Sequence, residues 1–238
     1  MNDKEKLMQE ENHSLHSLEI LTRVLRAPGG CPWDREQDHH SIRNDMIEEC
    51  YEVVEAIDTD DNTLLREELG DLLFQVFFHA QIEAEKGNFT IDDVVQDICD
   101  KMIYRHPHVF ADVKADTSEK VLENWETLKQ AEKQRKDTKA SMSAVPPMLP
   151  ALMRASKIAG KALKEEYNFG TEDEIRQQMA DCLNAIGTEK EEENLAKLSF
   201  LAAILSKKHG GDLEAALQKE TNEFINQYNT TKNMEEMK

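Results

Sequence analysis

Glycine, proline and aromatic residues are scarce in this sequence, and long apolar runs are missing. The 238 residues include nine glycines, six prolines and 6% aromatic residues, whereas residues that favour helices, such as Glu, Lys, Leu and Ala, are frequent. This balance predicts an all-α fold. No run of about 18 apolar residues is present to span a membrane, and the charged N-terminal stretch MNDKEKLMQEENHS lacks the apolar core of a signal peptide. We therefore expect a soluble, cytoplasmic protein with no membrane partner.

Cysteine is also rare, and its spacing argues against two common uses. The four cysteines, Cys31, Cys50, Cys99 and Cys182, lie far apart in the sequence and form no C-x-x-C pair. Neither a zinc knuckle nor a disulfide framework is therefore expected, and the pattern fits a reducing compartment.

Positive charge is in deficit, since 29 Lys and Arg residues stand against 48 Asp and Glu residues. The formal net charge of −19 would repel nucleic acid, so no nucleic-acid partner is expected. A ligand that carries phosphate must be met by a local cluster of Lys and Arg or by bound cations.

Helical periodicity and its interruptions divide the chain into segments. Helices are expected at about 14–26, 41–58, 63–86, 89–106 and 118–135. Between the first two, the stretch RAPGGCPWDREQ (26–37) is predicted to be a loop, because proline and Gly-Gly break the helical pattern. Thr90 is predicted to cap the fourth helix with Asp93 bonding back to it, and Pro107 is predicted to end that helix.

The polar stretch KQRKDTKASMSAVPPMLP, ending in a Pro-Pro stop, has the composition of a linker. It predicts an N-terminal domain at 1–135, a linker at 136–147 and a C-terminal domain at 148–238.

Two segments of the second domain are partly similar in sequence to two segments of the first. QQMADCLNAI (177–186) is similar to EECYEVVEAI (48–57), and ENLAKLSFLAAIL (193–205) is similar to EELGDLLFQVFFH (67–79). The pattern predicts an internal duplication.

Carboxylates are concentrated in two segments whose other positions are largely apolar. IRNDMIEECYEVVEAI carries the pair Glu49 and Glu52, and LLREELGDLLFQVFFHA carries the pair Glu68 and Asp71. Residues three apart lie on nearly the same face of a helix, so each predicted helix offers two carboxylates side by side. Ionised groups within an apolar stripe are costly to desolvate, and these helices lack enough Lys and Arg to pair with all four. A hard divalent cation, Mg²⁺ or Mn²⁺, is therefore the expected partner.

Basic and aromatic residues offer a complement to these acids. Lys101 and Arg105 lie four residues apart on a predicted helix and present two cations on one face, where phosphate oxygens can bind. A pair of surface side chains is the alternative interpretation. Trp33 and Trp125 are the two tryptophans, and either can stack on a base or complete a core.

These motifs together resemble a known family. GGCPWDREQ, EECYEVVEAI, EELGDLLFQVFFHA, KMIYRHPHVF and NWE are similar to the N-terminal half of MazG nucleoside triphosphate pyrophosphohydrolases, including the family's E-E-x-x-E and E-x-x-D signature. The resemblance runs from about 18 to 131 and continues more weakly to about 228. It implies an all-α, MazG-like helical bundle built from tandem duplicated units.

The resemblance also implies a site and an activity. The implied Mg²⁺ ligands are Glu49, Glu52, Glu68 and Asp71. The implied catalytic neighbours, which orient or activate water, are Glu48 and Glu67, and the implied substrate contacts are Lys101, Arg105, Trp33 and Trp125. Such an enzyme hydrolyses nucleoside triphosphates to the monophosphate and pyrophosphate by water attack at the α-phosphorus, and it works as a homodimer.

The second half departs from the family signature. The E-E-x-x-E motif is replaced by Q-Q-x-x-D at 177–181, and E-x-x-D is replaced by N-x-x-K at 194–197. Lys197 stands at the position that matches Asp71 and makes divalent binding there unfavourable. Catalysis is therefore expected in the first half, and the C-terminal domain is expected to be degenerate.

Alternative interpretations remain open on sequence alone. The acids can form a solvated helix face of a non-catalytic regulatory protein. The shared signature also occurs in related all-α pyrophosphatases that act on dUTP or phosphoribosyl-ATP, so a single-substrate enzyme is possible. A di-iron bundle needs Glu-x-x-His on the site helices, and that spacing occurs only at Glu10/His13 and Glu36/His39, outside the acidic segments.

Overall fold

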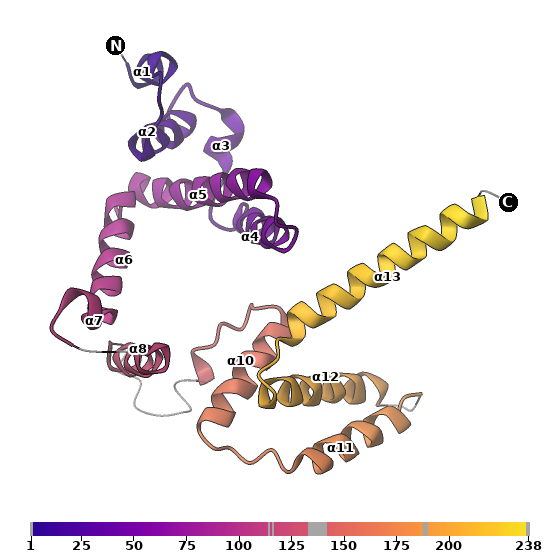
Figure 1. Cartoon of the computed structure of the whole chain (residues 1–238). Helices are drawn as coiled ribbons and strands as arrows, with labels where there is room; N and C mark the ends of the chain where they lie inside the picture. Colours follow the sequence, from indigo (N-terminus) through magenta and orange to yellow (C-terminus); the bar gives the residue numbers. More distant parts are fainter. Residues whose placement is uncertain (1, 114, 116, 133–141, 188–189, 237–238) are drawn as a thin grey trace. The chain divides into compact units, whose positions relative to one another are not determined.

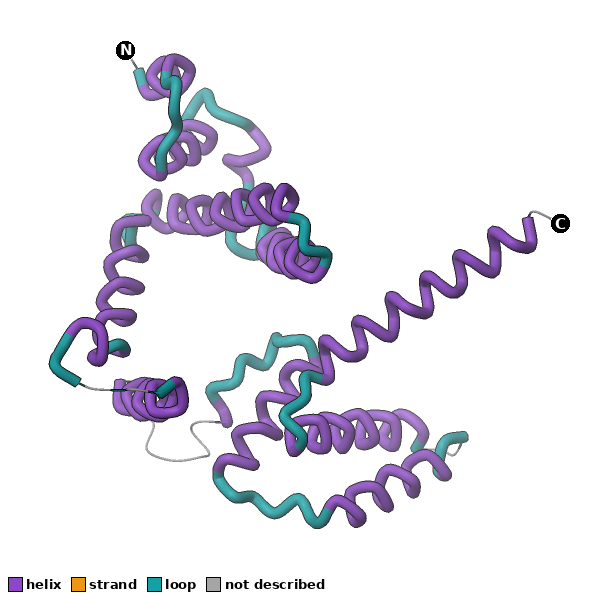
Figure 2. The backbone as a smooth tube through the Cα atoms, viewed as in Figure 1, coloured by secondary structure: helices purple, strands orange, loops and turns teal. Residues whose placement is uncertain are grey.

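The structure is a computed structural model that describes residues 2–113, 115, 117–132, 142–187 and 190–236. Helices joined by loops make up these residues, and none of them lies in a strand (Figure 2). The all-α prediction is confirmed. The helices are α1 Asp3–Gln9, α2 Leu15–Arg26, α3 Pro32–Glu36, α4 Arg43–Asp58, α5 Asn62–Glu85, α6 Ile91–Arg105, α7 Pro107–Phe110, α8 Ser118–Glu132, α10 Ala151–Lys164, α11 Glu172–Asn184, α12 Glu191–Lys208 and α13 Leu213–Glu236. In the described part, no helix combines the length and the apolar character needed to cross a membrane.

The chain divides into two compact units, Met1–Leu122 and Glu123–Lys238, which are described separately. The division falls within α8, earlier than the expected end of the first domain at 135. Much of the expected linker, residues 136–141, lies outside the described residues. The domain boundaries proposed from the sequence therefore stay a prediction.

Local sequence signals account for the ends of several helices in the first unit. Thr90 caps α6, since its backbone N–H donates to Asp93 Oδ2 at 2.8 Å and its Oγ1 accepts from the Asp93 N–H at 3.4 Å. This is the predicted capping box. Asp61 caps α5 by its side chain alone, with Oδ1 accepting from the N–H groups of Thr63 and Leu64. Gly87 follows α5 with φ of 72°, a conformation that glycine adopts without strain.

Two prolines begin short helices. Pro32 is the first residue of α3, so the expectation of an uninterrupted loop at 26–37 was wrong for that part. Pro107 does follow the end of α6, as predicted, but it also starts the single turn of α7. Proline suits the first position of a helix because its φ is already helical and no backbone N–H is needed there.

The helices α4 and α5 form a hairpin on which the rest of the first unit is built (Figure 1). Ile42, just before α4, is buried against Phe78 and Ile82 near the far end of α5. A second apolar cluster joins α5 to α6 through Phe77, Ala80 and Ile91. These two clusters lie in the C-terminal half of α5, which leaves the N-terminal half of that helix for polar contacts with α4.

The second unit contains a similar helix pair, α11 and α12, side by side in Figure 1 and covered by α10. Its core consists of Ala159, Ile175, Cys182, Leu201 and Ile204. The pairing of α11 with α12 agrees with the predicted duplication of the α4 and α5 pair. The long helix α13 follows and extends beyond α10 and α12 (Figure 1).

Candidate functional site

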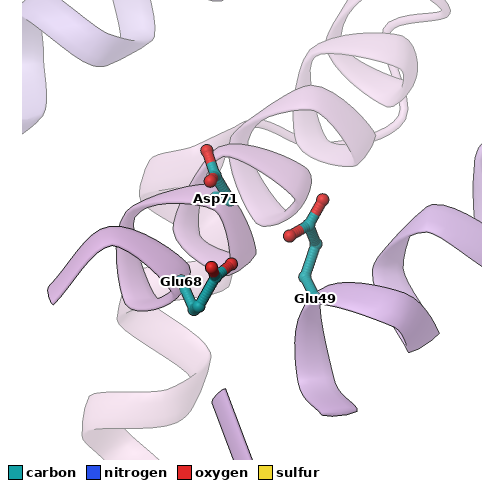
Figure 3. Close-up of side chains that lie close together, drawn as sticks. All are labelled: Glu49, Glu68 and Asp71. Atoms are coloured by element: carbon teal, nitrogen blue, oxygen red, sulfur yellow. The ribbon is translucent and has the colours of Figure 1, made fainter. Parts of the chain in front are cut away.

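Three carboxylates meet between α4 and α5. Glu49 comes from α4, whereas Glu68 and Asp71 come from successive turns of α5, and the three side chains lie close together (Figure 3). One oxygen from each residue lies within 4.8 Å of the others. The structure therefore brings together three of the four carboxylates that the sequence suggested as metal ligands.

The other predicted acids surround this group. The Glu52 side chain is within hydrogen-bond reach of both Glu49 and Glu68. Glu48 and Glu67 are each next in sequence to a cluster residue and are exposed to solvent. Glu68 is only 9% exposed, Glu49 is half-buried and Asp71 is exposed, so the cluster is covered on one side and open on the other. A small ligand can reach it from the Asp71 side.

Burial and mutual repulsion make the protonated form of these acids more favourable. The pKa of Glu49 rises to about 7, chiefly because burial disfavours the charged form, and further because of the hydrogen bond to Glu52 and the charge of Asp71. The pKa of Glu68 is also raised, first by burial and then by the charges of Glu52 and Asp71. A divalent cation would offset both effects, because it places positive charge where the carboxylates repel one another.

The chemistry of the donor set fits a hard cation. The ligand atoms that the cluster offers to a metal are carboxylate oxygens, which suit Mg²⁺ or Mn²⁺ better than zinc. None of the described histidines or cysteines belongs to the group.

Comparison with known proteins places this geometry in a family. Residues 37–110 match the MazG nucleotide pyrophosphohydrolase domain. A Thermotoga maritima protein named nucleoside triphosphate pyrophosphohydrolase/pyrophosphatase MazG is 37% identical over 97% of this chain and 89% of its own length. The chain belongs to the MazG family. An Escherichia coli K12 protein named nucleoside triphosphate pyrophosphohydrolase is 39% identical over 87% of this chain and 82% of its own length. The uncharacterized Bacillus subtilis protein YabN is 50% identical over 61% of this chain, and the match spans 30% of YabN.

The two basic residues that the sequence suggested as substrate contacts, Lys101 and Arg105, lie on another helix. Lys101 and Arg105 are one turn apart on α6; Lys101 is half-buried, whereas Arg105 is only 7% exposed. The helix α5 continues for 14 residues, about 21 Å, beyond Asp71 before α6 begins. Their role in substrate binding stays a prediction.

The two tryptophans lie outside the MazG-matched region. Trp33 is on α3 and is 58% exposed, with its backbone oxygen accepting a hydrogen bond from Gln37 Nε2 at 2.9 Å. Trp125 is half-buried on α8, beyond the division between the two units. At this exposure Trp33 does not complete a core, which was one of the two roles considered for the tryptophans.

The second unit of this MazG chain lacks a comparable cluster among its described residues. Gln177 Nε2 donates to Asp181 Oδ1 at 2.9 Å, and Asn194 Nδ2 donates to the Lys190 backbone oxygen at 2.9 Å. Lys197 is exposed. Gln177, Asp181 and Asn194 thus make local contacts, and the described residues do not gather carboxylates between α11 and α12.

A polar network near the other end of the hairpin was not predicted from the sequence. His39 Nδ1 lies 2.7 Å from His79 Nδ1, and His39 Nε2 lies 2.6 Å from a Glu83 carboxylate oxygen. His79 and Glu83 are four residues apart on α5, a spacing that places them on one face. Nothing local indicates that His39, in a turn 40 residues earlier, lies against that face.

The raised pKa of Glu49 makes stability depend on pH. Glu49 binds its proton more tightly in the folded chain than in the unfolded chain, so protonation stabilises the fold fully below pH 4.5, and this contribution is lost as the pH rises through about 7. In EDTA, the free energy of unfolding of the wild type should fall between pH 5 and pH 7.5 by on the order of 1 kcal/mol more than that of Glu49→Gln, since screening by water reduces the full value. Urea unfolding at both pH values measures this, and equal falls in the two proteins would contradict the raised pKa.

Proposed function

We propose that this chain is a nucleoside triphosphate pyrophosphohydrolase that requires Mg²⁺, or Mn²⁺ in its place. Its substrates are nucleoside and deoxynucleoside triphosphates, and its products are the nucleoside monophosphate and pyrophosphate. The acidic cluster between α4 and α5 carries the proposal, because it lies within the region that matches the MazG domain. Two relatives that align over most of this chain bear the name of that activity.

The four carboxylates Glu49, Glu52, Glu68 and Asp71 would hold the cation. When bound, Mg²⁺ neutralises the charge that develops on the phosphate oxygens and makes water a better nucleophile at neutral pH. The exposed acids Glu48 and Glu67 lie next to ligand residues in the sequence. Either carboxylate can accept a proton from the attacking water or fix its orientation, which suits attack at the α-phosphorus.

Basic and aromatic side chains would bind different parts of the substrate. Lys101 and Arg105 would neutralise the triphosphate, and the planar rings of Trp33 and Trp125 would contact the nucleoside. The net charge of −19 supports a small substrate that arrives with its own cation and disfavours a nucleic-acid partner. We place this activity in the cytoplasm.

A homodimer would complete the site. On α4, the exposed residues Ile47, Tyr51 and Val54 recur at helical spacing on the side opposite Glu49 and Ala56, the side that faces α5. On α5, Leu69 and Leu73 are also exposed. Apolar stripes of this kind on two neighbouring helices favour burial against another helix pair. In such a dimer, Lys101 and Arg105 of a second chain can also approach these carboxylates.

The products identify the reaction. Incubation of the protein with a panel of nucleoside and deoxynucleoside triphosphates and Mg²⁺ should yield monophosphate and pyrophosphate, and EDTA should abolish turnover because carboxylate oxygens are the ligands. Chromatography of the products is the measurement, and the panel separates a broad enzyme from a dUTP-type one. Diphosphate with free phosphate, or full activity in chelator, would refute the proposal.

Catalysis should reside in the first unit. Glu52→Gln keeps the side-chain size but removes one negative charge from the cluster, and it should lower the rate by about a hundredfold, on the order of 3 kcal/mol in the barrier. Glu55→Gln makes the same change one turn further along α4, at an exposed position, and should have little effect. Lys197→Ala should be near neutral. Pyrophosphate release per folded chain, with folding checked by circular dichroism, decides this; a loss in Lys197→Ala would reveal a working second site.

The exposed stripe on α4 should control assembly. Val54→Asp places a charge in the proposed interface and should convert the dimer to a monomer, because a buried unpaired charge costs several kcal/mol. Met8→Asp changes an equally apolar and more exposed residue on α1 and should leave the dimer intact. Sedimentation equilibrium measures the mass of both variants. A wild type that sediments as a monomer would remove the dimer from the proposal.

A further inference from the structure

The two hairpin helices are held in a defined register by a contact at their far end. Ile42, at the start of α4, packs on Phe78 of α5. Glu49 lies seven residues after Ile42, and Asp71 lies seven residues before Phe78. Seven residues make almost two helical turns, so equal steps along two antiparallel helices return to neighbouring positions on the same face. The packing at Ile42 therefore sets which α5 residues Glu49 meets.

The polar network of His39, His79 and Glu83 reinforces this contact. His39 lies three residues before Ile42, in a turn that Asp38 closes by accepting hydrogen bonds from the N–H groups of His40 and Ser41 at 2.8 and 2.9 Å. The imidazole rings of His39 and His79 meet edge to edge through their Nδ1 atoms, with centroids 5.0 Å apart and an angle of 9° between their planes. The turn that leads into α4 is thus joined to α5 by an apolar contact and by a hydrogen-bonded one.

The hydrogen bond between the two rings imposes a limit on their protons. A bond between two Nδ1 atoms needs one N–H donor and one bare nitrogen as acceptor. Glu83 stays ionised, because hydrogen bonds from Lys86, Asn88 and His39 lower its pKa to about 2. Its carboxylate accepts from His39 Nε2, so that nitrogen carries a proton. The arrangement holds with both rings neutral or with one charged, and it is lost when both are charged.

The surroundings favour the neutral form of His79. Burial lowers the pKa of His79, and the charge of His39 lowers it further. The charged and titratable groups around the pair are Glu83 and Lys86 of α5, Asp38 and His40 of the turn, and Arg26 of α2 with its partner Glu85. Arg26 forms two hydrogen bonds with Glu85 at 2.9 Å, so its charge is already compensated beside the pair.

We propose that His39 and His79 are positioning residues, which share one proton and thereby hold α4 in the register that brings Glu49 to Glu68 and Asp71. Neither histidine belongs to the carboxylate cluster. They would affect metal binding only by setting the spacing of the carboxylates. Any effect on catalysis rests on the proposed function. Loss of their hydrogen bond would loosen the start of α4 from the C-terminal part of α5.

Nitrogen NMR of the wild type, labelled with ¹⁵N-histidine, tests the shared proton directly. At pH 8 we expect the His39 ring to carry its proton on Nε2 and the His79 ring to carry its proton on Nδ1. Two rings that both carry the proton on Nε2 would overturn the proposal, since no hydrogen bond between the Nδ1 atoms is then possible.

Mn²⁺ binding at pH 8, followed by electron paramagnetic resonance, tests the link to the metal site. His79→Phe keeps a planar ring without the hydrogen bond and should weaken Mn²⁺ binding about tenfold, the size found for groups that orient metal ligands. His79→Gln keeps a donor and should restore most of the affinity. His40→Phe is the matched control, because its exposed ring makes no described hydrogen bond. Binding by His79→Phe equal to the wild type, or equal losses in the Phe and Gln variants, would overturn the proposal.

Amide hydrogen exchange keeps this inference separate from the proposed function. In the metal-free protein, exchange in α4 around Glu49 should be faster in His79→Phe than in His40→Phe. A wild type that binds no Mn²⁺ refutes the metal site, while the histidine tautomers and the exchange rates still decide the positioning role. Unchanged exchange in His79→Phe would refute the role even if the wild type binds Mn²⁺ and hydrolyses triphosphates.

Discussion

Repulsion among carboxylates between two packed helices is the constraint on which the first unit depends. Glu68 is almost wholly buried, and Glu49 is held near it with a raised pKa, so this part of the hairpin opposes its own closure. The opposing forces lie elsewhere on the same helices, in the apolar cluster of Ile42, Phe78 and Ile82 and in the hydrogen bonds of Asp61 to the start of α5. The carboxylates are thus held close together by contacts of residues that lie outside the cluster.

The second unit shows what the same helix pair becomes without that repulsion. Ile175 of α11 is fully buried and packs with Leu201 and Ile204 of α12 in one apolar core. The positions that match the acids include amides, one Asp and Lys197; Gln177 and Asp181 bond to each other, and Asn194 bonds to the Lys190 backbone oxygen. Hydrophobic burial then stabilises the pair by itself, and a unit of this kind can serve folding or assembly without binding a metal.

The sequence predicted those features of the fold that depend on neighbours in the chain. Thr90 and Asp93 form the expected capping box, and the spacing of Glu68 and Asp71 placed both on one side of α5. The short helices at Pro32 and Pro107 were missed because proline both ends one helix and begins another, and composition alone does not say which. The pairing of His39 with His79 was not predictable, since it depends on a turn folding back over a helix that lies 40 residues away. The position of Lys101 relative to the acids depends on how α6 packs against α5, and Trp125 belongs to the other unit; no periodicity encodes either placement.

The seven-residue step shared by α4 and α5 also sets what changes in chain length the hairpin can accept. A residue inserted between Ile42 and Glu49 would leave the apolar contact in place but rotate Glu49 by about 100° away from α5, and a deletion would rotate it the other way. The turn at Thr59, Asp60 and Asp61 joins the two helices and lies outside both seven-residue segments. The hairpin can therefore accept substitutions along both helices, but the number of residues from Ile42 to Glu49 and from Asp71 to Phe78 must stay constant. Insertions and deletions are tolerated only in the turn.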